Sequence, residues 1–347
     1  MAVTIEDVAR EANVSIATVS RVMNNTKAVS PELRERVFSA IRKTSFRPNV
    51  LARGLITNRT YTIGVVISDI SNPVFGVLTK GINSVCQDRG YTVVICESDG
   101  KRKKELALLE KLAEQRIDGL LFAGVDVNRE LIDRMLCLDY PVVLVTQEES
   151  YGENRMMTVS HDNQRATFDA IDFLVSCGHR RIAFIGGPVN DYSSGEKRLE
   201  GYRLAMAKHG LETPGTYIEH GDFSFDAGFS GMKRIYEESE KLPTAVMACS
   251  DLMAIGAMQC ARNMGLSIPE DVSFMGFDDS ELARYSTPAL STVRISYYDE
   301  GVLAAEELFR SMDSDNGEET NIRYIPHKII RRGSVNCLRA TAGNPTA

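Results

Sequence analysis

The side chains with the clearest chemical role in this chain belong to the run VSIATVSRVMNNT, residues 14–26. A short helical pattern at Ile5–Glu11 precedes the run, and Ser15, a residue type that often caps helices, begins a second helix within it. Two helices joined by such a short turn are typical of a helix-turn-helix, whose second helix presents the side chains of its first two turns to the DNA major groove. The chemistry expected at this run is therefore recognition of DNA.

Catalytic and metal-binding patterns do not stand out in the sequence. The run Ile185-Gly186-Gly187 lacks the further glycines of a dinucleotide fingerprint, and His161-Asp162 has no nucleophile at a recognisable position. The seven cysteines form neither a C-x-x-C motif nor a Cys/His cluster with zinc spacing. Most of them lie in apolar stretches, so we expect buried thiols in a reducing cytosol, with no metal, no cofactor and no enzyme activity.

The charges divide the chain into a basic head and an acidic body. With 347 residues, 43% of them hydrophobic, the chain is long enough for two or three domains with ample cores. Residues 1–60 carry ten Lys/Arg against five Asp/Glu, a net charge of +5, whereas the other 287 residues carry 30 against 42, a net charge of −12. Because DNA phosphates attract the head and are repelled by the body, we expect double-stranded DNA to bind only the head.

The start of the chain does not have the pattern of a secretion signal, and no apolar run approaches the ~18 residues of a membrane span. We therefore expect a cytoplasmic protein that has no membrane partner.

Local signals predict three short helices with a small core in the head. Thr4 followed by Asp7 resembles a capping box that begins the first helix, and Ser30-Pro31 is an N-cap with proline at the first position of the third helix. Phe46-Arg47-Pro48 ends that helix. The apolar positions expected to pack in this core are Val8, Val19, Val22, Leu33, Val37 and Ile41.

The segment Asn49–Leu55 has a helical pattern of only about two turns and contains Gly54. Isolated helices shorter than ~12 residues are marginal in water, and glycine weakens them further. We therefore expect this segment to be disordered alone and to fold only when another surface supports it. A polar connector over residues 57–62 follows.

From Tyr61 onward, strand and helix patterns alternate in two successive series. Such alternation predicts parallel sheets with helices on both faces, arranged here in two lobes, with a ligand cleft between the lobes at the carboxyl ends of the strands. We interpret His161 as a hydrogen-bonding residue between the lobes. The predicted strands are 62–68, 91–98, 118–124, 141–147, 181–187, 244–250 and 272–278, and the predicted helices are 76–90, 101–116, 129–138, 163–177, 196–209, 225–238 and 252–264.

Six motifs, by their order and spacing, make the chain resemble the lactose/galactose-repressor (LacI/GalR) family of bacterial transcription regulators over essentially its whole length. They are DVAREANVSIATVSRVMN, RPNVLARGL, DISNPVF, RLEGYR, GFDDSELA and TPALSTV. The resemblance implies a sequence-specific DNA-binding repressor that acts as a homodimer on a pseudo-palindromic operator. It also implies that a small-molecule effector, a sugar or sugar derivative, controls the affinity for the operator.

The fold implied by the resemblance is an all-α helix-turn-helix head with a hinge helix, followed by a two-lobed α/β core like that of periplasmic binding proteins. We expect the head at residues 1–48, the hinge helix and linker at 49–60, and the effector-binding and dimerisation core at 61–340. The expected lobes of the core are an N-lobe of residues 61–161 plus 292–325 and a C-lobe of residues 162–291 plus 326–340.

By position in the family, Ile16, Ala17 and Arg21 resemble base-reading residues. Arg21 suits bidentate contact with guanine, whereas the other two offer apolar contact, for instance to thymine methyl groups. A salt link from Arg21 to a phosphate is the alternative for that residue, and helix capping and solvation are the alternative for Thr18 and Ser20. The residues that resemble phosphate contacts are Thr4, Ser15, Thr18, Ser20 and Asn24.

Asn49–Leu55 matches the hinge helix of the family, with Asn49 as a further DNA contact. In the family two such helices pair and insert a leucine from each into the minor groove; Leu55 is the matching residue, and Ala52 lies at the close contact between the helices. Alternatively, Leu55 packs on the body as a linker residue. A helix that folds only on DNA would act as a switch.

Matching positions in the body imply an effector site in the cleft. Phe75 and Phe223 resemble stacking aromatics, Arg198 a charged anchor for a hydroxyl pair or carboxylate, and Asp278 a hydroxyl acceptor. Structural ion pairing is the alternative for Arg198 and Asp278. The remaining predicted site residues, at strand ends, are Asp69 and Ser250. At position 250, sugar-binding relatives often have Asn, Asp or Thr instead.

Two other functions fit the sequence less well. A periplasmic-type sugar-binding protein would have an export signal and would not have a DNA-binding head, and a doubly wound enzyme would need a phosphate loop or a nucleophile–base set. Tetramers in the family use a leucine-repeat tail, whereas this chain ends GSVNCLRATAGNPTA, which favours a dimer. Some members respond to a phosphocarrier protein, but Glu306 and Glu307 on the helix Glu300–Arg310 oppose a basic docking face.

Overall fold

The computed structural model describes residues 3–24, 29–46, 59–150, 155–313 and 322–338. The chain divides into two compact units, residues 1–61 and 62–347, and each unit is described by itself. No helix of the described ranges is both long and apolar enough to cross a lipid bilayer.

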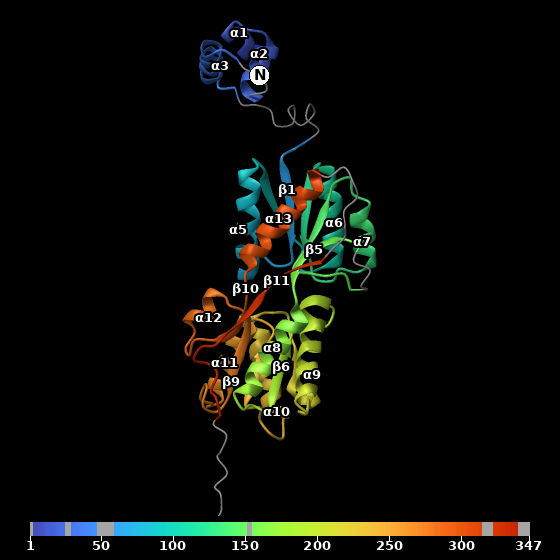
Figure 1. Cartoon of the computed structure of the whole chain (residues 1–347), viewed down its shortest axis with the longest axis vertical. Helices are drawn as coiled ribbons and strands as arrows, with labels where there is room; N and C mark the ends of the chain where they lie inside the picture. The colour runs from blue at the N-terminus through green and yellow to red at the C-terminus, as the bar shows by residue number, and fades with distance from the viewer. Residues whose placement is uncertain (1–2, 25–28, 47–58, 151–154, 314–321, 339–347) are drawn as a thin grey trace, which may run out of the picture. The chain divides into compact units, whose positions relative to one another are not determined.

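The first unit contains three helices, α1 (Ile5–Ala12), α2 (Ile16–Asn24) and α3 (Pro31–Thr44) (Figure 1). The capping box predicted at the start of α1 is present, because Thr4 and Asp7 each accept a hydrogen bond from the other's backbone N–H. The core is formed by Val8, Ala9, Ala12, Val19, Val22, Val37 and Ala40. Leu33, expected in this core, is only half-buried, and the buried stripe of α3 consists of Val37 and Ala40.

The second unit begins with a six-stranded parallel sheet in the order β11-β5-β4-β3-β1-β2. Helices α6 and α7 pack together over β1, and α13 packs on α5, β3, β4 and β5. The strands are β1 (Thr62–Ile67), β2 (Thr92–Glu97), β3 (Gly119–Ala123), β4 (Val142–Val145), β5 (Met157–His161) and β11 (Ile322–Ile325). The helices are α5 (Pro73–Asp88), α6 (Arg102–Glu114), α7 (Arg129–Leu136) and α13 (Tyr297–Asp313).

A second six-stranded sheet has the order β12-β10-β9-β8-β6-β7, and only the pairing of β10 with β12 is antiparallel among its described strands. Its strands are β6 (Ile182–Gly186), β7 (Ile218–His220), β8 (Ala245–Ala248), β9 (Ser273–Asp278), β10 (Ser291–Ile295) and β12 (His327–Ile330). Its helices are α8 (Asn163–Ser176), the π-helical turn η1 (Tyr192–Glu196), α9 (Lys197–Lys208), the 3₁₀ turn η2 (Gly215–Tyr217), α10 (Phe225–Glu238), α11 (Asp251–Asn263) and α12 (Glu281–Tyr285). The predicted fold class, a helical head with a two-lobed α/β core, is confirmed.

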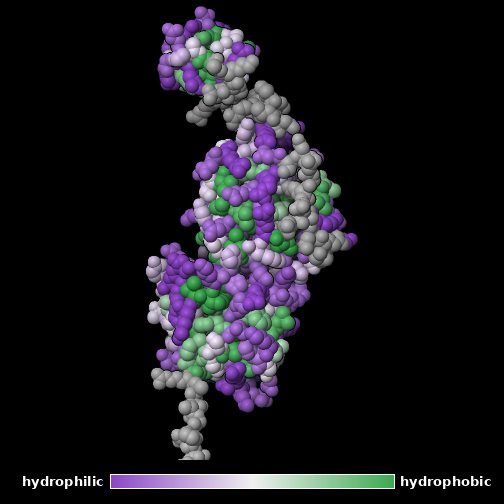
Figure 2. Space-filling model, viewed as in Figure 1, coloured by the Kyte–Doolittle hydropathy of each residue, from purple (hydrophilic) through white to green (hydrophobic). Residues whose placement is uncertain are grey.

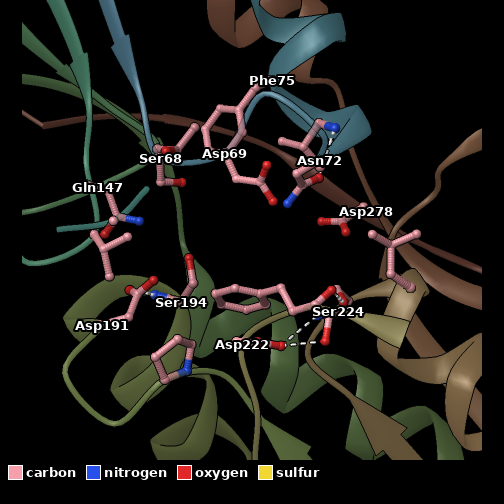
Figure 3. Close-up of a pocket in the computed structure, with 18 of the residues that line it drawn as sticks. Ser68, Asp69, Asn72, Phe75, Gln147, Asp191, Ser194, Asp222, Ser224 and Asp278 are labelled. Atoms are coloured by element: carbon pink, nitrogen blue, oxygen red, sulfur yellow. Dashed lines mark hydrogen bonds between the residues drawn. The ribbon is translucent and has the colours of Figure 1, made fainter. Parts of the chain in front are cut away.

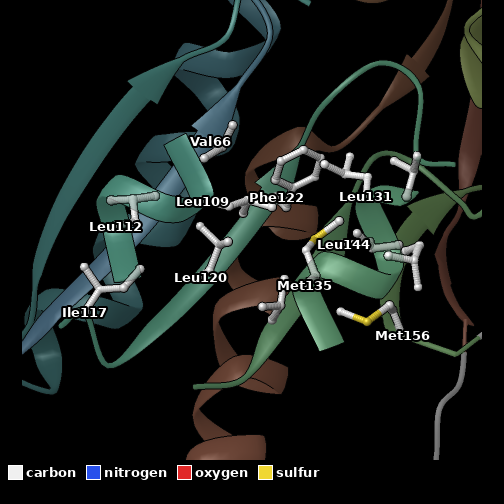
Figure 4. Packing of buried hydrophobic residues seen from close by; sticks show 13 residues of the cluster. Val66, Leu109, Leu112, Ile117, Leu120, Phe122, Leu131, Met135, Leu144 and Met156 are labelled. Carbon is white, nitrogen blue, oxygen red and sulfur yellow. The ribbon is translucent and has the colours of Figure 1, made fainter. Parts of the chain in front are cut away.

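Apolar side chains between helices and sheet hold each lobe together. Figure 4 shows one such cluster in the first lobe, in which α6 and α7 contribute Leu109, Leu112, Leu131 and Met135. These side chains meet Val66, Leu120, Phe122 and Leu144 from the strands. Removal of this apolar surface from water stabilises the lobe and holds the carboxyl ends of its strands in register.

The body differs from the sequence-based expectation at several elements, among them strand β5 and the start of the second N-lobe segment. Strand β5 was not predicted, because its buried positions include Thr158, Ser160 and His161 and therefore lack an apolar run. The N-lobe segment expected from residue 292 is wrong at its start: β10 pairs with β9 and β12 in the second sheet. The chain returns to the first lobe only after Ile295, with α13.

Candidate functional site

The turn between α1 and α2 sets the direction of α2. Asn13, with φ of 49°, ends α1 in the left-handed region, and the N–H of Val14 donates to the carbonyl of Ala9 at 3.0 Å. Nη2 of Arg36 in α3 donates to the carbonyls of Ala12 at 2.7 Å and Asn13 at 3.2 Å. Sequence reasoning missed Arg36 because no local pattern indicates a contact with a turn more than twenty residues away.

Helix α2 has one buried and one exposed side. Val19 and Val22 are buried in the core of the first unit. The three predicted base-reading residues, Ile16, Ala17 and Arg21, are exposed, and at 3.6 residues per turn they lie on the side opposite these valines. Ile16 is 46% exposed, so its apolar side chain is available for contact. This side of α2 therefore offers apolar and arginine contacts together.

Three of the predicted phosphate-contacting residues, Thr4, Ser15 and Thr18, lie near the start of the first two helices. Thr4 caps α1, and Ser15 accepts a hydrogen bond from the N–H of Thr18 at 3.2 Å, with the two hydroxyl groups 2.9 Å apart. Ser15 therefore caps α2 and remains exposed, and the Thr18 hydroxyl contacts this capping hydroxyl. Ser20 is half-buried. Of the others, Asn24 ends α2, and Asn49, Ala52 and Leu55 lie outside the described residues.

A cavity of about 740 Å³ lies between the two lobes of the body and is lined by all six residues predicted for the effector site. This volume is within the range of small-molecule pockets, roughly 300–1,000 Å³. Figure 3 shows Asp69, Asn72 and Phe75 extending into the cavity from the first lobe, and Ser194, Asp222 and Ser224 from the second. The structure therefore brings together side chains as far apart in the chain as Asp69 and Asp278.

In the first lobe, the loop after β1 positions two of the predicted side chains. Asp69 follows the carboxyl end of β1, and its Oδ1 accepts hydrogen bonds from the N–H and hydroxyl of Ser71 at 2.8 and 2.7 Å. Asn72 then caps α5 by accepting from the N–H of Val74, which orients Phe75 on the first turn of the helix. Strand end, turn and cap together place an aspartate and an aromatic ring on one wall.

In the second lobe, Phe223 and Ser250 contact each other at the ends of β7 and β8. Phe223 has φ of 69°, and its carbonyl accepts a hydrogen bond from the Ser250 hydroxyl at 3.4 Å. The same hydroxyl accepts from the N–H of Met253 at 3.2 Å and so caps α11. Ser250 lines the cavity, but both hydrogen bonds of its hydroxyl group are made with the protein backbone.

Arg198 is 3% exposed, and its guanidinium is held on three sides. Nε donates to Oδ1 of Asn163 at 2.7 Å, Nη1 donates to the carbonyl of Cys249, and Nη2 lies 3.3 Å from Nε2 of His161. Its guanidinium carbon lies 3.6 Å from the centroid of the Phe277 ring, a cation–π contact. These partners fix the plane of the guanidinium at the cavity wall.

Asp278 ends β9 with a left-handed φ of 119°, a strained conformation for a residue other than glycine. Its Oδ1 accepts a hydrogen bond from the hydroxyl of Tyr297 at 2.7 Å, which joins the second lobe to α13 of the first. Burial raises the pKa of Asp278 to about 6, although the positive charge of Arg198 opposes this shift. Burial and the nearby Asp278 raise the pKa of Asp251 to about 8.

Several lining residues were not predicted as ligand contacts. The amide oxygen of Gln147 is buried and has no hydrogen-bond partner within the described ranges. Asp191 accepts from the N–H of Ser194 at 2.7 Å, and burial raises its pKa to about 6. Their location just after strands β4 and β6 was a usable signal, since ligands of parallel sheets bind at such ends. Further lining residues that were not predicted as ligand contacts include His161, Asp222 and Tyr297.

No group of three His, Cys, Asp or Glu side chains in the described part of the chain is arranged to hold a metal ion.

Comparisons with known proteins match both units. Residues 4–49 match the family model "Bacterial regulatory proteins, lacI family", and residues 171–335 match "Periplasmic binding protein-like domain". Catabolite control protein A of Priestia megaterium is 37% identical, with 96% of this chain and 99% of that protein covered. The ribose operon repressor of Escherichia coli (strain K12) is 35% identical, with coverages of 95% and 99%. A solved structure of the lac repressor dimer bound to operator and the anti-inducer ONPF has a TM-score of 0.86 and 25% identity, with coverages of 97% and 100%.

Proposed function

Because the chain belongs to the lacI family of bacterial regulatory proteins, whose members bind DNA and regulate transcription, we propose that it is a repressor controlled by a neutral sugar bound in the cavity of its body. The cavity, lined by polar groups and aromatic rings from both lobes, is the observation that carries this proposal. The relatives named as repressors support the repressor function and argue against a periplasmic sugar carrier. We infer that the protein works in the cytoplasm, where it meets DNA.

The chemistry of the cavity wall suits a polyhydroxylated ligand. Carboxylates at Asp69 and Asp278 accept hydrogen bonds from hydroxyl groups, and the amide oxygen of Gln147 is a further acceptor without a protein partner in the described part of the chain. The rings of Phe75 and Phe223 offer apolar surfaces to the faces of a sugar ring. Hydrogen-bond acceptors beside aromatic rings are the combination that binds a carbohydrate.

The balance of charge on the wall favours a neutral sugar over a sugar phosphate. Arg198 is the one Lys or Arg side chain among the described lining residues, and three of its nitrogens already have protein partners. A phosphate would be repelled by the surrounding carboxylates and would lack a second cation to pair with. The aspartates that line the cavity are Asp69, Asp99, Asp191, Asp222 and Asp278.

On the DNA side, we propose that Ile16, Ala17 and Arg21 contact base edges and so choose the operator sequence. Their joint exposure on α2 supports this role. We further propose that the hinge segment 49–55, with Leu55 as its wedge, transmits the state of the cavity to the head. The proposed phosphate contacts are Thr4, Ser15, Thr18, Ser20, Asn24 and Asn49, and the proposed contact between hinge helices is Ala52.

We also propose that the active form is a homodimer, which reads two half-sites of a pseudo-palindromic operator. The lac repressor in the similar solved structure is a dimer. Exposed apolar side chains of the body support self-association: Val77 on α5 and Tyr298 on α13, which are 43% and 44% exposed, lie on helices that pack together. Figure 2 shows apolar patches on the visible face of both lobes.

Two measurements test the proposal: the rise in melting temperature that a ligand causes, and the change in operator binding caused by the same ligand. Purified full-length protein is heated with neutral pentoses, hexoses and disaccharides, and with the phosphate ester of each, and the rise in melting temperature is compared within each pair. A stabilising sugar is then added to the complex with operator DNA in a mobility-shift assay. We expect a neutral sugar to stabilise the protein and change operator affinity. Stabilisation by the phosphate esters alone would contradict the proposed ligand class.

A further inference from the structure

We propose that Cys177 and Cys337 are a disulfide-forming pair that closes on oxidation and fastens the C-terminal segment Ser334–Leu338 to the end of helix α8. The two thiol sulfurs lie 2.7 Å apart, although the residues are separated by 160 positions in the chain. Sulfurs in a disulfide lie about 2.04 Å apart, so bond formation requires a shift of only about 0.7 Å. This proposal is independent of the identity of the effector.

The backbone holds the two cysteines opposite each other from both sides of Cys337. On one side, the N–H of Leu338 donates to the carbonyl of Cys177 at 2.7 Å. On the other side, Nε2 of His179 lies 3.0 Å from the carbonyl oxygen of Asn336. The proximity of the sulfurs therefore follows from a fixed main-chain arrangement and does not depend on one side-chain rotamer alone.

Gly178 allows the two segments to approach this closely. It follows Cys177 directly, with φ of 93°, and a Cβ atom there would lie 2.8 Å from the carbonyl oxygen and 3.2 Å from the Cβ of Leu338. The C-terminal segment is also held one residue before Cys337, where the N–H of Asn336 donates to the hydroxyl of Ser273 at 2.9 Å. Any larger residue at position 178 would push the segment away from α8.

The two thiols differ in exposure, which assigns their roles in the reaction. Cys337 is partly exposed and accessible to a small oxidant, whereas Cys177 is buried at the end of α8. Burial, and then the neighbouring Cys337, raise the pKa of the Cys177 thiol to about 11. Because the thiolate is the reactive form, Cys337 is the residue that reacts with an oxidant first, and Cys177 is the resolving residue.

With hydrogen peroxide as oxidant, the reaction balances in two steps. The Cys337 thiolate attacks one peroxide oxygen and breaks the O–O bond, so that Cys337 becomes a sulfenic acid and the departing hydroxide takes up a proton to form water. The Cys177 sulfur then attacks the Cys337 sulfur, the S–O bond breaks, and a second water leaves with the proton from Cys177. Both sulfurs are oxidised to the disulfide, and one peroxide is reduced to two waters.

The test uses the full-length protein, reduced and then exposed to hydrogen peroxide before the remaining thiols are blocked. Trypsin releases Cys177 in ATFDAIDFLVSCGHR and Cys337 in GSVNCLR. We expect the two peptides to appear joined, two hydrogen masses below their sum, and to separate on reduction. Because the bond closes a long loop, the oxidised protein should melt roughly 5 °C or more above the reduced protein.

Three variants decide the outcome. C337S and C177S should each lose the joined peptide and the rise in melting temperature. Of the two variants, C337S keeps the packing of α8, because it changes the partly exposed cysteine. C137S removes the exposed cysteine on the first lobe and should retain both effects. The proposal is overturned if peroxide leaves the two peptides separate, with Cys337 unmodified or oxidised to the sulfinic acid, or if the rise in melting temperature persists in C337S.

Discussion

His161 and Glu300 face each other inside the first lobe, with Nδ1 of the imidazole 3.4 Å from Oε2 of the carboxylate. Glu300 is fully buried and His161 is 1% exposed. The other ring nitrogen, Nε2, lies 3.3 Å from Nη2 of Arg198 in the second lobe. The imidazole therefore connects a buried carboxylate on α13 to the guanidinium at the cavity wall, so the two lobes share one charged network.

Replacing Glu300 with Ala should destabilise the body strongly. The change removes the buried carboxylate that lies opposite the imidazole of His161, and breaking a buried charged contact of this kind costs about 3–5 kcal/mol of unfolding free energy. Urea denaturation at neutral pH measures the loss. Glu306→Ala, on the exposed side of the same helix, is the matched control and should cost less than about 0.5 kcal/mol. Equal effects of the two substitutions would show that the buried contact contributes nothing.

The raised pKa of Asp278 predicts a pH dependence with a definite sign. Because its folded pKa is about 6, above the ordinary value of 3.8, the native state holds the proton more tightly than the unfolded chain. Asp278 therefore stabilises the fold at low pH, and this contribution is lost as pH rises from about 4 to 6. Asp278→Asn, which stays neutral, should gain on the order of 1–3 kcal/mol relative to the natural protein over that interval.

Denaturant unfolding of both proteins at a series of pH values measures this difference. Between pH 4 and 6 the free energy of unfolding of the variant should rise relative to the natural protein. The charge of Asp278 also helps to raise the pKa of Asp251 to about 8, so Asp251 should ionise at lower pH in the variant, and the difference should level off only above about pH 8. A difference that is constant from pH 4 to 7 would mean that Asp278 has an ordinary pKa.

Arg36→Ala should weaken the head without changing its sequence preference. The guanidinium holds the carbonyls of Ala12 and Asn13 in the turn before α2, and loss of these hydrogen bonds should cost about 1 kcal/mol of head stability. Operator affinity should then fall by a similar factor for every operator variant. Arg42→Ala removes an exposed arginine of the same helix, paired with Glu35, and serves as the control of equal charge change. A base-specific loss in the Arg36 variant would contradict a purely positioning role.

The sequence predicted the elements whose stabilising interactions are local in the chain, and it missed elements whose burial depends on distant residues. Helix α10 was predicted at residues 225–238, its observed bounds, because its cap and apolar spacing are local. The strand-end rule and the family resemblance together named six residues that line one cavity. Strand β5 was missed because its burial comes from both faces of the sheet and not from apolar residue types.

The buried charges were beyond reach of the sequence. Glu307 was interpreted as one of two residues that oppose a basic docking face on helix α13, yet its side chain is buried and held between Arg310 and Arg323. Glu300 on the same helix is fully buried. Only the packing of α13 against the first sheet brings these partners together, and β11, which carries Arg323, was itself not predicted. Long-range partners of this kind leave no periodic signal in the chain.

Arg21→Ala should lower the affinity for the specific operator by about 1–3 kcal/mol and relax the preference at one base position. A guanidinium that bonds to a guanine edge distinguishes the base, whereas one that contacts a phosphate does not. Binding to a library of operator variants, at fixed salt concentration, separates the two cases. If the loss is uniform over all sequences and shrinks at higher salt, Arg21 is a phosphate contact.

Arg198→Ala should abolish the response to the effector while operator binding persists. Its guanidinium is fixed by Asn163, Cys249 and His161 with part of its edge at the cavity wall, so the substitution removes the one cationic anchor among the described lining residues. The measurement is operator affinity with and without the sugar that stabilises the natural protein. Arg203→Ala, an exposed change on the same helix α9, should retain the full response. A normal response in the Arg198 variant, with the fold intact, would assign Arg198 to the structural network with His161 and Glu300 alone.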